Sequence, residues 1–235
     1  MLDNERVSQY TSHSSQSAHE HLFELFLFIN PLDRNSLEAE KELLYFIKQS
    51  KANVYFRLIC YHDYPCIQEL MQKQKGTHHT TEECNQLFLA IYQMALSYKA
   101  ALFQGKKRGR QMLLAMQEYF INEEQAFSND DMKAIAASVG LDVDMWLEDL
   151  HSDRVRRDYQ EDMRLARQMN IITQPSLVVF DSLNFEYGVK VENIMSATEI
   201  EELLTDLASS TEQLMNDNNT VSPCPLHAVK NRYYQ

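Results

Sequence analysis

The stretch from residue 23 to residue 40, FELFLFINPLDRNSLEAE, constrains the fold more than any other part of the sequence. Phe23 to Ile29 is short and almost uniformly apolar, which is typical of a strand buried on both faces, and Pro31 ends it. An amphipathic helix is predicted from Ser36 to about Gln49. Its apolar face carries Leu37, Leu43, Leu44 and Ile47, and its other faces carry Glu38, Glu40, Lys41 and Lys48.

A second strand is predicted at residues 53–61, NVYFRLICY. Two strands joined by a helix of this length run parallel, because the connection is far longer than a hairpin turn. The first unit of the fold is therefore β-α-β.

Residues 63–170 contain several helical patterns and no convincing strand. Thr80 and Glu83 form a capping box ahead of the longest helix, whose apolar stripe includes Leu87, Ile91, Met94 and Tyr98. We expect this helical insertion to pack as one unit over the rest of the fold, with Trp146 and Leu147 largely buried. A chain with only 5 Gly and 5 Pro is expected to be rich in helix.

The last elements return to strands. IITQPSLVVF (171–180) is predicted as a strand and FEYGVKV (185–191) as its hairpin partner. Ser196 and Glu199 form a second capping box ahead of a final helix. We expect a flexible polar tail at 1–21, one domain at 22–215 and a C-terminal tail at 216–235.

The charge of the chain argues against nucleic acid as a partner. The formal net charge is −12, and the one basic cluster, at 106–110, is too small for a nucleic-acid footprint. The sequence has no pattern typical of a signal peptide and no apolar run of the ~18 residues that a membrane span needs. We therefore expect a cytoplasmic protein with no membrane association.

The sequence predicts no cofactor and no metal site. Its 4 cysteines lack the paired short spacings of disulfide frameworks and zinc sites. Cys60 and Cys66 are interpreted as buried thiols, Cys84 starts a capped helix, and Cys224 lies in a loop or tail. His78 and His79 would need His62 or Asp63 to hold a metal, and a solvated loop explains them better.

The order β-α-β, helical block, β-β-α resembles the DsbA-like thioredoxin superfamily over about residues 22–215. Two segments carry the resemblance: the strand-Asn-Pro-helix junction, and Asn170 to Phe180, which is similar to the superfamily's loop with a cis-proline. The resemblance implies an α/β, thioredoxin-like fold of the DsbA type, rich in helix and with a helical insertion. It also implies that Pro175, after Gln174, is that proline.

Within the superfamily, the FINPL strand end is most similar to the YjbH/SpxH-type adapters. The resemblance implies binding of the transcription regulator Spx, a regulator in the stress response, and its delivery to the ClpXP protease. In members that keep a C-x-x-C motif, this motif follows Asn-Pro-Leu. Here Asp33, Arg34, Asn35 and Ser36 stand in its place. Some members carry a zinc-linked tail rich in His and Cys, whereas here His13, His19 and His21 have no accompanying cysteine.

The absence of a C-x-x-C motif bears on whether the protein is an enzyme or a binding protein. Thiol-disulfide exchange needs a thiolate, which Asp33 and Ser36 do not supply, and both residues are well suited to capping a helix. We therefore favour a non-catalytic adapter with no catalytic residue, whose partner-binding residues the sequence does not assign. The alternative is a DsbA-like thiol oxidoreductase or isomerase that uses a residue outside the motif.

Overall fold

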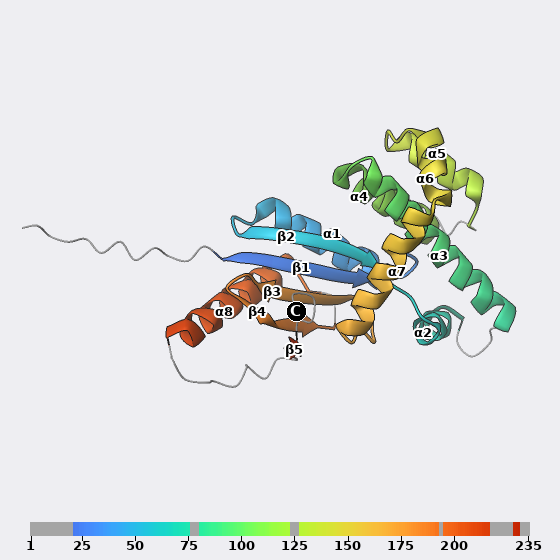
Figure 1. Ribbon diagram of the computed structural model, residues 1–235. Coiled ribbons are helices and arrows are strands. Elements are labelled where there is room, and N and C mark those ends of the chain that lie inside the picture. Colours follow the sequence, from blue (N-terminus) through green and yellow to red (C-terminus); the bar gives the residue numbers. More distant parts are fainter. Residues whose placement is uncertain (1–20, 76–79, 123–126, 193–194, 217–227, 231–235) are drawn as a thin grey trace, which may run out of the picture.

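The computed structural model describes residues 21–75, 80–122, 127–192, 195–216 and 228–230 (Figure 1). Its strands form one mixed sheet in the order β2-β1-β3-β4-β5. β1 and β2 are parallel, and the other neighbours are antiparallel. The strands are β1 (Leu22–Ile29), β2 (Asn53–Cys60), β3 (Ser176–Asp181), β4 (Asn184–Val191) and β5 (Ala228–Lys230).

Helices make up most of the described chain, as the composition predicts. They are α1 (Arg34–Gln49), α2 (Tyr64–Lys75), α3 (Thr81–Phe103), α4 (Lys106–Gln117), the π-helical turn η1 (Glu118–Asn122), α5 (Asn129–Ser138), α6 (Val143–His151), α7 (Asp153–Gln168) and α8 (Ala197–Asn216). The predicted thioredoxin-like order is confirmed, with α2 to α7 between β2 and β3. Both predicted capping boxes form, at Thr80 and at Ser196.

Two element starts differ from the sequence predictions by two residues or more, and one strand is additional. α1 begins at Arg34 rather than Ser36, because the side chain of Asp33 already caps it. β3 begins at Ser176, five residues later than predicted, since residues 171–175 form a loop before it. Residues 228–230, within the expected C-terminal tail, add β5 to the edge of β4.

The alternating side chains of β1 divide the core into two layers. Phe23, Leu25, Leu27 and Ile29 pack with residues of α1, α3, α4 and α8. Phe26 and Phe28 pack with α7 on the other face. Since β1 is buried on both faces, its almost continuous apolar sequence is explained. In Figure 1, α7 crosses near the ends of β1 and β2 closest to the insertion, and α3 to α6 lie beyond it.

The apolar stripe of α3 is buried as predicted at Ile91, Met94 and Tyr98 and only half-buried at Leu87. Trp146 of α6 is buried and donates a hydrogen bond from Nε1 to the carbonyl oxygen of Ser97 at 3.0 Å. Leu147 is only half-buried, because it lines an open cleft of about 380 Å³ beside α6. The helical insertion thus keeps one incompletely filled surface.

Candidate functional site

The turn between β1 and α1 is held by a closed hydrogen-bond network. Asp33 Oδ2 accepts hydrogen bonds from the backbone N–H and the hydroxyl of Ser36, at 2.9 and 3.0 Å. The hydroxyl oxygen of Ser36 accepts from the N–H of Asn30 at 3.1 Å. Asp33 and Ser36 are both buried. The Ser36 hydroxyl is therefore occupied in holding the turn, with both of its hydrogen bonds made inside the helix cap.

The other two positions of the junction are exposed. Arg34 reaches across to η1, where its guanidinium donates to Asn122 Oδ1 at 3.2 Å. Asn35 faces solvent. The four positions where the superfamily resemblance places a redox motif thus form a helix cap with two exposed polar side chains.

The loop before β3 lies against the same turn. The peptide bond between Gln174 and Pro175 is cis. The Gln174 amide donates to the carbonyl oxygen of Tyr61, and Gln174 lines a depression together with Asp33 and Cys66. The structure therefore brings together the two segments that the sequence singles out. The depression has a volume of about 10 Å³, which is about the space of one water molecule.

Cys66 lies beside this turn, where it lines the depression with Asp33, a proximity that the sequence does not predict. Its N–H donates to Asp63 Oδ1 at 2.9 Å, and its Sγ lies 3.7 Å from the carbonyl oxygen of Ile172. Burial, together with the neighbouring Asp63 carboxylate, raises the pKa of Cys66 to about 12. This thiol is therefore protonated at neutral pH, the opposite of what disulfide exchange requires.

The other two described cysteines are also buried. Cys60 is buried at the end of β2, and burial raises the pKa of its thiol well above the ordinary value. Cys84 is buried at the start of α3. Cys224 lies outside the described residues. None of the three described thiols is a candidate nucleophile on these grounds.

The surface around the turn carries exposed apolar side chains. Ile172, in the loop before β3, is 61% exposed, and Tyr64 at the start of α2 is 46% exposed. Beside them, Lys73 pairs with Glu69 at 2.8 Å within α2. Exposed apolar side chains near a depression of only about 10 Å³ are suited to contact with another protein rather than to enclosing a small substrate.

Glu40 corrects one prediction. The sequence predicts that Glu40 lies on a polar face of α1, whereas it is completely buried and neither carboxylate oxygen has a hydrogen-bond partner within the described residues. Its spacing of three residues from both Leu37 and Leu43 is the signal that reveals the error. Burial raises the pKa of Glu40 to about 8, so the group is mostly protonated at neutral pH.

The described histidines do not belong to a metal-binding cluster. His62 is enclosed by the rings of Phe88, Tyr92 and Tyr159, and burial lowers its pKa to about 4. Among the described residues, no three His, Cys, Asp or Glu side chains are close enough to hold a metal ion. His13, His19, His78 and His79 lie outside the described residues. His21 is described, and its Nδ1 lies 2.7 Å from Asp181 Oδ2.

Within the described part of the chain, every helix is too short or too polar to cross a bilayer. A sequence model of the family described as Thioredoxin matches residues 26–210. This match begins within β1 and ends within α8, and it includes the helical insertion.

The sequence is also similar to proteins named ClpXP adapter protein SpxH. That of Bacillus subtilis (strain 168) is 32% identical over 126 residues, which cover 53% of this chain and 42% of that protein. That of Bacillus licheniformis is 35% identical over 119 residues, which cover 50% of this chain and 40% of that protein. The chain thus spans about two fifths of the length of these curated relatives.

Solved structures of DsbA-like proteins have the same fold. A protein described as a putative protein disulfide isomerase from Nitrosomonas europaea has a TM-score of 0.61 at 12% identity, covering 80% of this chain and 98% of that chain. DsbA from Pseudomonas aeruginosa has a TM-score of 0.55 at 14% identity, covering 83% of this chain and 86% of that one. At these identities the likeness concerns the fold alone.

Proposed function

The chain belongs to the thioredoxin family, and from this premise we propose that it is a non-catalytic adapter that delivers a regulator of the Spx type to the ClpXP protease. The observation that carries the proposal is the sequence similarity to several proteins named as ClpXP adapters. We further propose that it acts in the cytoplasm, as part of a stress response.

The chemistry of the α1 turn supports a role without catalysis. An adapter needs only to bind its client and hold it near the protease, since tethering raises the local concentration of the client without any covalent step. Asp33 and Ser36 are committed to the helix cap, and the Cys66 thiol is protonated. In this proposal the exposed surface of Ile172 and Tyr64 contacts the client.

The test is reconstituted proteolysis. Purified ClpXP and Spx are incubated with and without the chain, and the half-life of Spx is followed on gels. We expect faster loss of Spx with the chain present and no change for a ClpXP substrate that needs no adapter. Unchanged Spx turnover, in the presence of demonstrated Spx binding, would restrict the role of this chain to binding.

Two variants locate the client surface in the same assay. Ile172→Glu combined with Tyr64→Glu should slow Spx turnover, because it places two charges on the proposed apolar contact. Met145→Glu is the control for an added surface charge, since Met145 is 52% exposed on α6, which lies apart from α2 in Figure 1. Equal effects of the two changes would argue against this surface.

The oxidoreductase alternative predicts a different result. If the chain is a non-catalytic adapter, replacing all four cysteines by Ala or Ser should leave Spx turnover unchanged. Only some stability should be lost, at the buried Cys60, Cys66 and Cys84. Insulin reduction by the wild-type chain, or loss of Spx turnover in a folded cysteine-free variant, would favour thiol chemistry instead.

A further inference from the structure

β2 forms one edge of the sheet, and part of its outer backbone is open. In a parallel pair, alternate residues of a strand direct their backbone groups to the same neighbour. Tyr61 N–H donates to Ile29 at 3.0 Å, so the odd-numbered residues of β2 face β1 and the even-numbered ones face outward. Outward, the Leu58 carbonyl accepts from the Tyr98 hydroxyl at 3.3 Å. Within the described residues, the outward backbone groups of Val54 and Phe56 have no partner.

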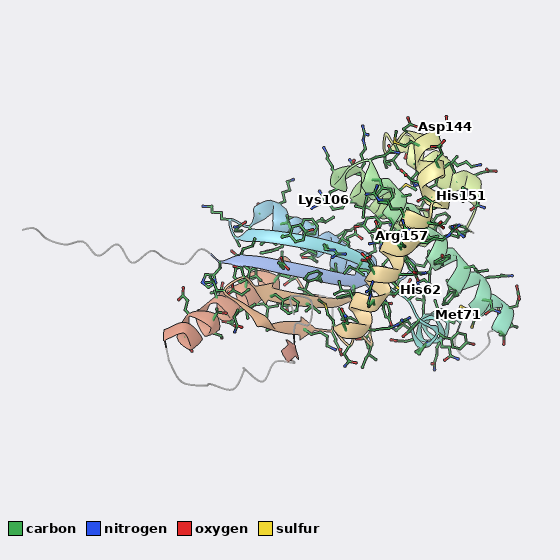
Figure 2. All side chains as sticks on the ribbon, in the orientation of Figure 1. His62, Met71, Lys106, Asp144, His151 and Arg157 are labelled. Atoms are coloured by element: carbon green, nitrogen blue, oxygen red, sulfur yellow. The ribbon has the colours of Figure 1, made fainter. Side chains whose placement is uncertain are left out.

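A groove of about 330 Å³ runs beside this edge, between β2 and helices α3, α4 and α7. Lys106 Nζ lies 4.6 Å from the centre of the Tyr55 ring, and Arg110 Cζ lies 5.2 Å from that of Phe56. Tyr55 and Phe56 are consecutive in the strand, so their side chains point to opposite faces of the sheet. The two cations therefore flank the open edge on both faces. Figure 2 labels Lys106 at the start of α4, on the side of β2.

The charges of the groove are unevenly distributed. Within the described part of the chain, neither Lys106 nor Arg110 forms an ion pair, whereas Arg57 and Lys99 both contact the buried carboxylate of Asp162. The acidic residues that line the groove, Asp158 and Glu161, belong to α7. The α4 wall is thus positive and the α7 wall negative, in a chain of net charge −12.

We propose that the edge of β2 binds an extended acidic segment of a partner protein as an added strand. The segment pairs with the open backbone groups of Val54 and Phe56, as in other cases of strand addition to a sheet edge. Its side chains alternate between the two faces, so two adjacent carboxylates, one on each face, meet Lys106 and Arg110. The proposal does not depend on the adapter role, and it concerns a surface distinct from the α1 turn.

Two other uses of this edge are less consistent with the observed charges. Pairing with β2 of a second copy would bring two basic segments, each containing Lys106 to Arg110, close together. Cations beside an edge strand can also serve only to prevent aggregation. In that case Tyr55 and Phe56 would still be shielded, but no peptide would bind.

The test uses a fluorescent valine-glutamate peptide, Val-Glu-Glu-Val-Glu-Glu-Val, blocked at both ends and titrated with the full chain in low salt. Each adjacent pair of glutamates places one carboxylate on each face of the added strand. We expect saturable binding that weakens as salt is added. Lys106→Glu combined with Arg110→Glu should weaken it by roughly tenfold or more. The matched control is Lys107→Glu combined with Arg108→Glu, which makes the same change of charge in the same helix at residues that do not line the groove. We expect at most a small effect from it.

Two further peptides separate strand addition from simple charge attraction. A peptide with N-methylated amides at alternate positions keeps its charge but cannot pair along one edge, and it should bind at least tenfold more weakly. A valine-lysine peptide should not bind. Thermal melts check that each variant is folded. If the Lys106→Glu, Arg110→Glu variant does not fold, the neutral double variant Lys106→Gln, Arg110→Gln is used in its place.

Three results would overturn the proposal. They are the absence of binding by the valine-glutamate peptide at millimolar concentration, equal binding of the N-methylated peptide, and equal effects of the two double charge reversals. Sedimentation of the chain without peptide adds a fourth, since a dimer that disappears on reversal of Lys106 and Arg110 would assign the edge to a second copy. The assay contains no client and no protease, so its outcome is independent of the adapter test.

Discussion

Asp33 Oδ2 lies 2.9 Å from the backbone nitrogen of Ser36 and 3.0 Å from its hydroxyl oxygen, so one carboxylate oxygen holds the start of α1. We expect Asp33→Ala to lower the free energy of unfolding by about 1–2 kcal/mol, since it removes the cap and leaves the buried hydroxyl short of a partner. Urea denaturation measures this. Asp142→Ala, which removes the more exposed cap of α6, should cost less. An equal loss of unfolding free energy in Asp33→Ala and Asp142→Ala would show that the buried network around Asp33 stabilises the fold no more than an ordinary helix cap does.

A cysteine introduced at the α1 turn should have a lowered pKa. In a background without the native cysteines, Asp33→Cys combined with Ser36→Cys places a thiol at the helix N-terminus, where the unpaired N–H groups stabilise an anion. We expect a pKa about one to two units below the usual ~8.5 for the thiol at position 33. Thiolate absorbance against pH measures it, with Tyr45→Cys on the exposed side of α1 as control. Equal pKa values at positions 33 and 45 would count against this account of the turn.

Glu40 should make stability depend on pH. Burial raises its pKa from 4.5 to about 8 in the folded state, so the folded chain keeps a proton that the unfolded chain loses. The stability contributed by this proton is complete below about pH 4.5 and is lost as the pH rises through about 8. Relative to Glu40→Gln, the wild-type chain should lose on the order of 4 kcal/mol over this range.

Urea denaturation of both proteins between pH 5 and pH 9 measures the difference. Glu38→Gln, an exposed position on the same helix, is the control and should follow the wild-type curve. Parallel curves for the wild-type chain and Glu40→Gln would mean that Glu40 reaches solvent or a partner in solution.

Replacing Asp162 by an uncharged residue should lower the stability of the fold. Its carboxylate on α7 contacts the guanidinium of Arg57, at 3.0 Å, and the buried ammonium of Lys99, so it joins the insertion to the sheet. Asp162→Asn leaves two cations without a counter-charge and should destabilise the fold by about 3–5 kcal/mol. Asp158→Asn, one turn earlier on α7 and partly exposed, should cost under about 1 kcal/mol. If adding Lys99→Met to Asp162→Asn recovers no stability, the cost arises elsewhere.

The sequence predicts the elements of this fold because local patterns determine them. The apolar run of β1 and the capping boxes at Thr80 and Ser196 are each contained within a few residues. The strand β5 is not predictable in the same way, since three residues carry too little pattern and depend on the edge that β4 offers. Boundaries next to the α1 turn shift because the Asp33 cap acts through a side chain rather than through periodicity.

The surroundings of the candidate site are less predictable, because they depend on contacts between distant segments. Both predicted motifs meet, yet Cys66 joins them only because α2 folds back beside the loop of Ile172. Likewise, the basic segment at Lys106 has the pattern of an ordinary solvated helix start, and only the folded chain places Lys106 against Tyr55 of β2. Composition gives the charges of these residues but not which strand they face.

The position of β1 between β2 and β3 has a consequence for synthesis of the chain. Phe23 pairs with Asp181, so a central strand must wait for a partner that follows roughly 150 residues later. At ~5–20 residues per second, this interval lasts roughly 8–30 s on the ribosome. During it the apolar β1 has an unpaired edge, which invites association with other chains. Ribosome-bound chains that stall before residue 176 should therefore recruit a holdase chaperone, whereas chains released after Val191 should not.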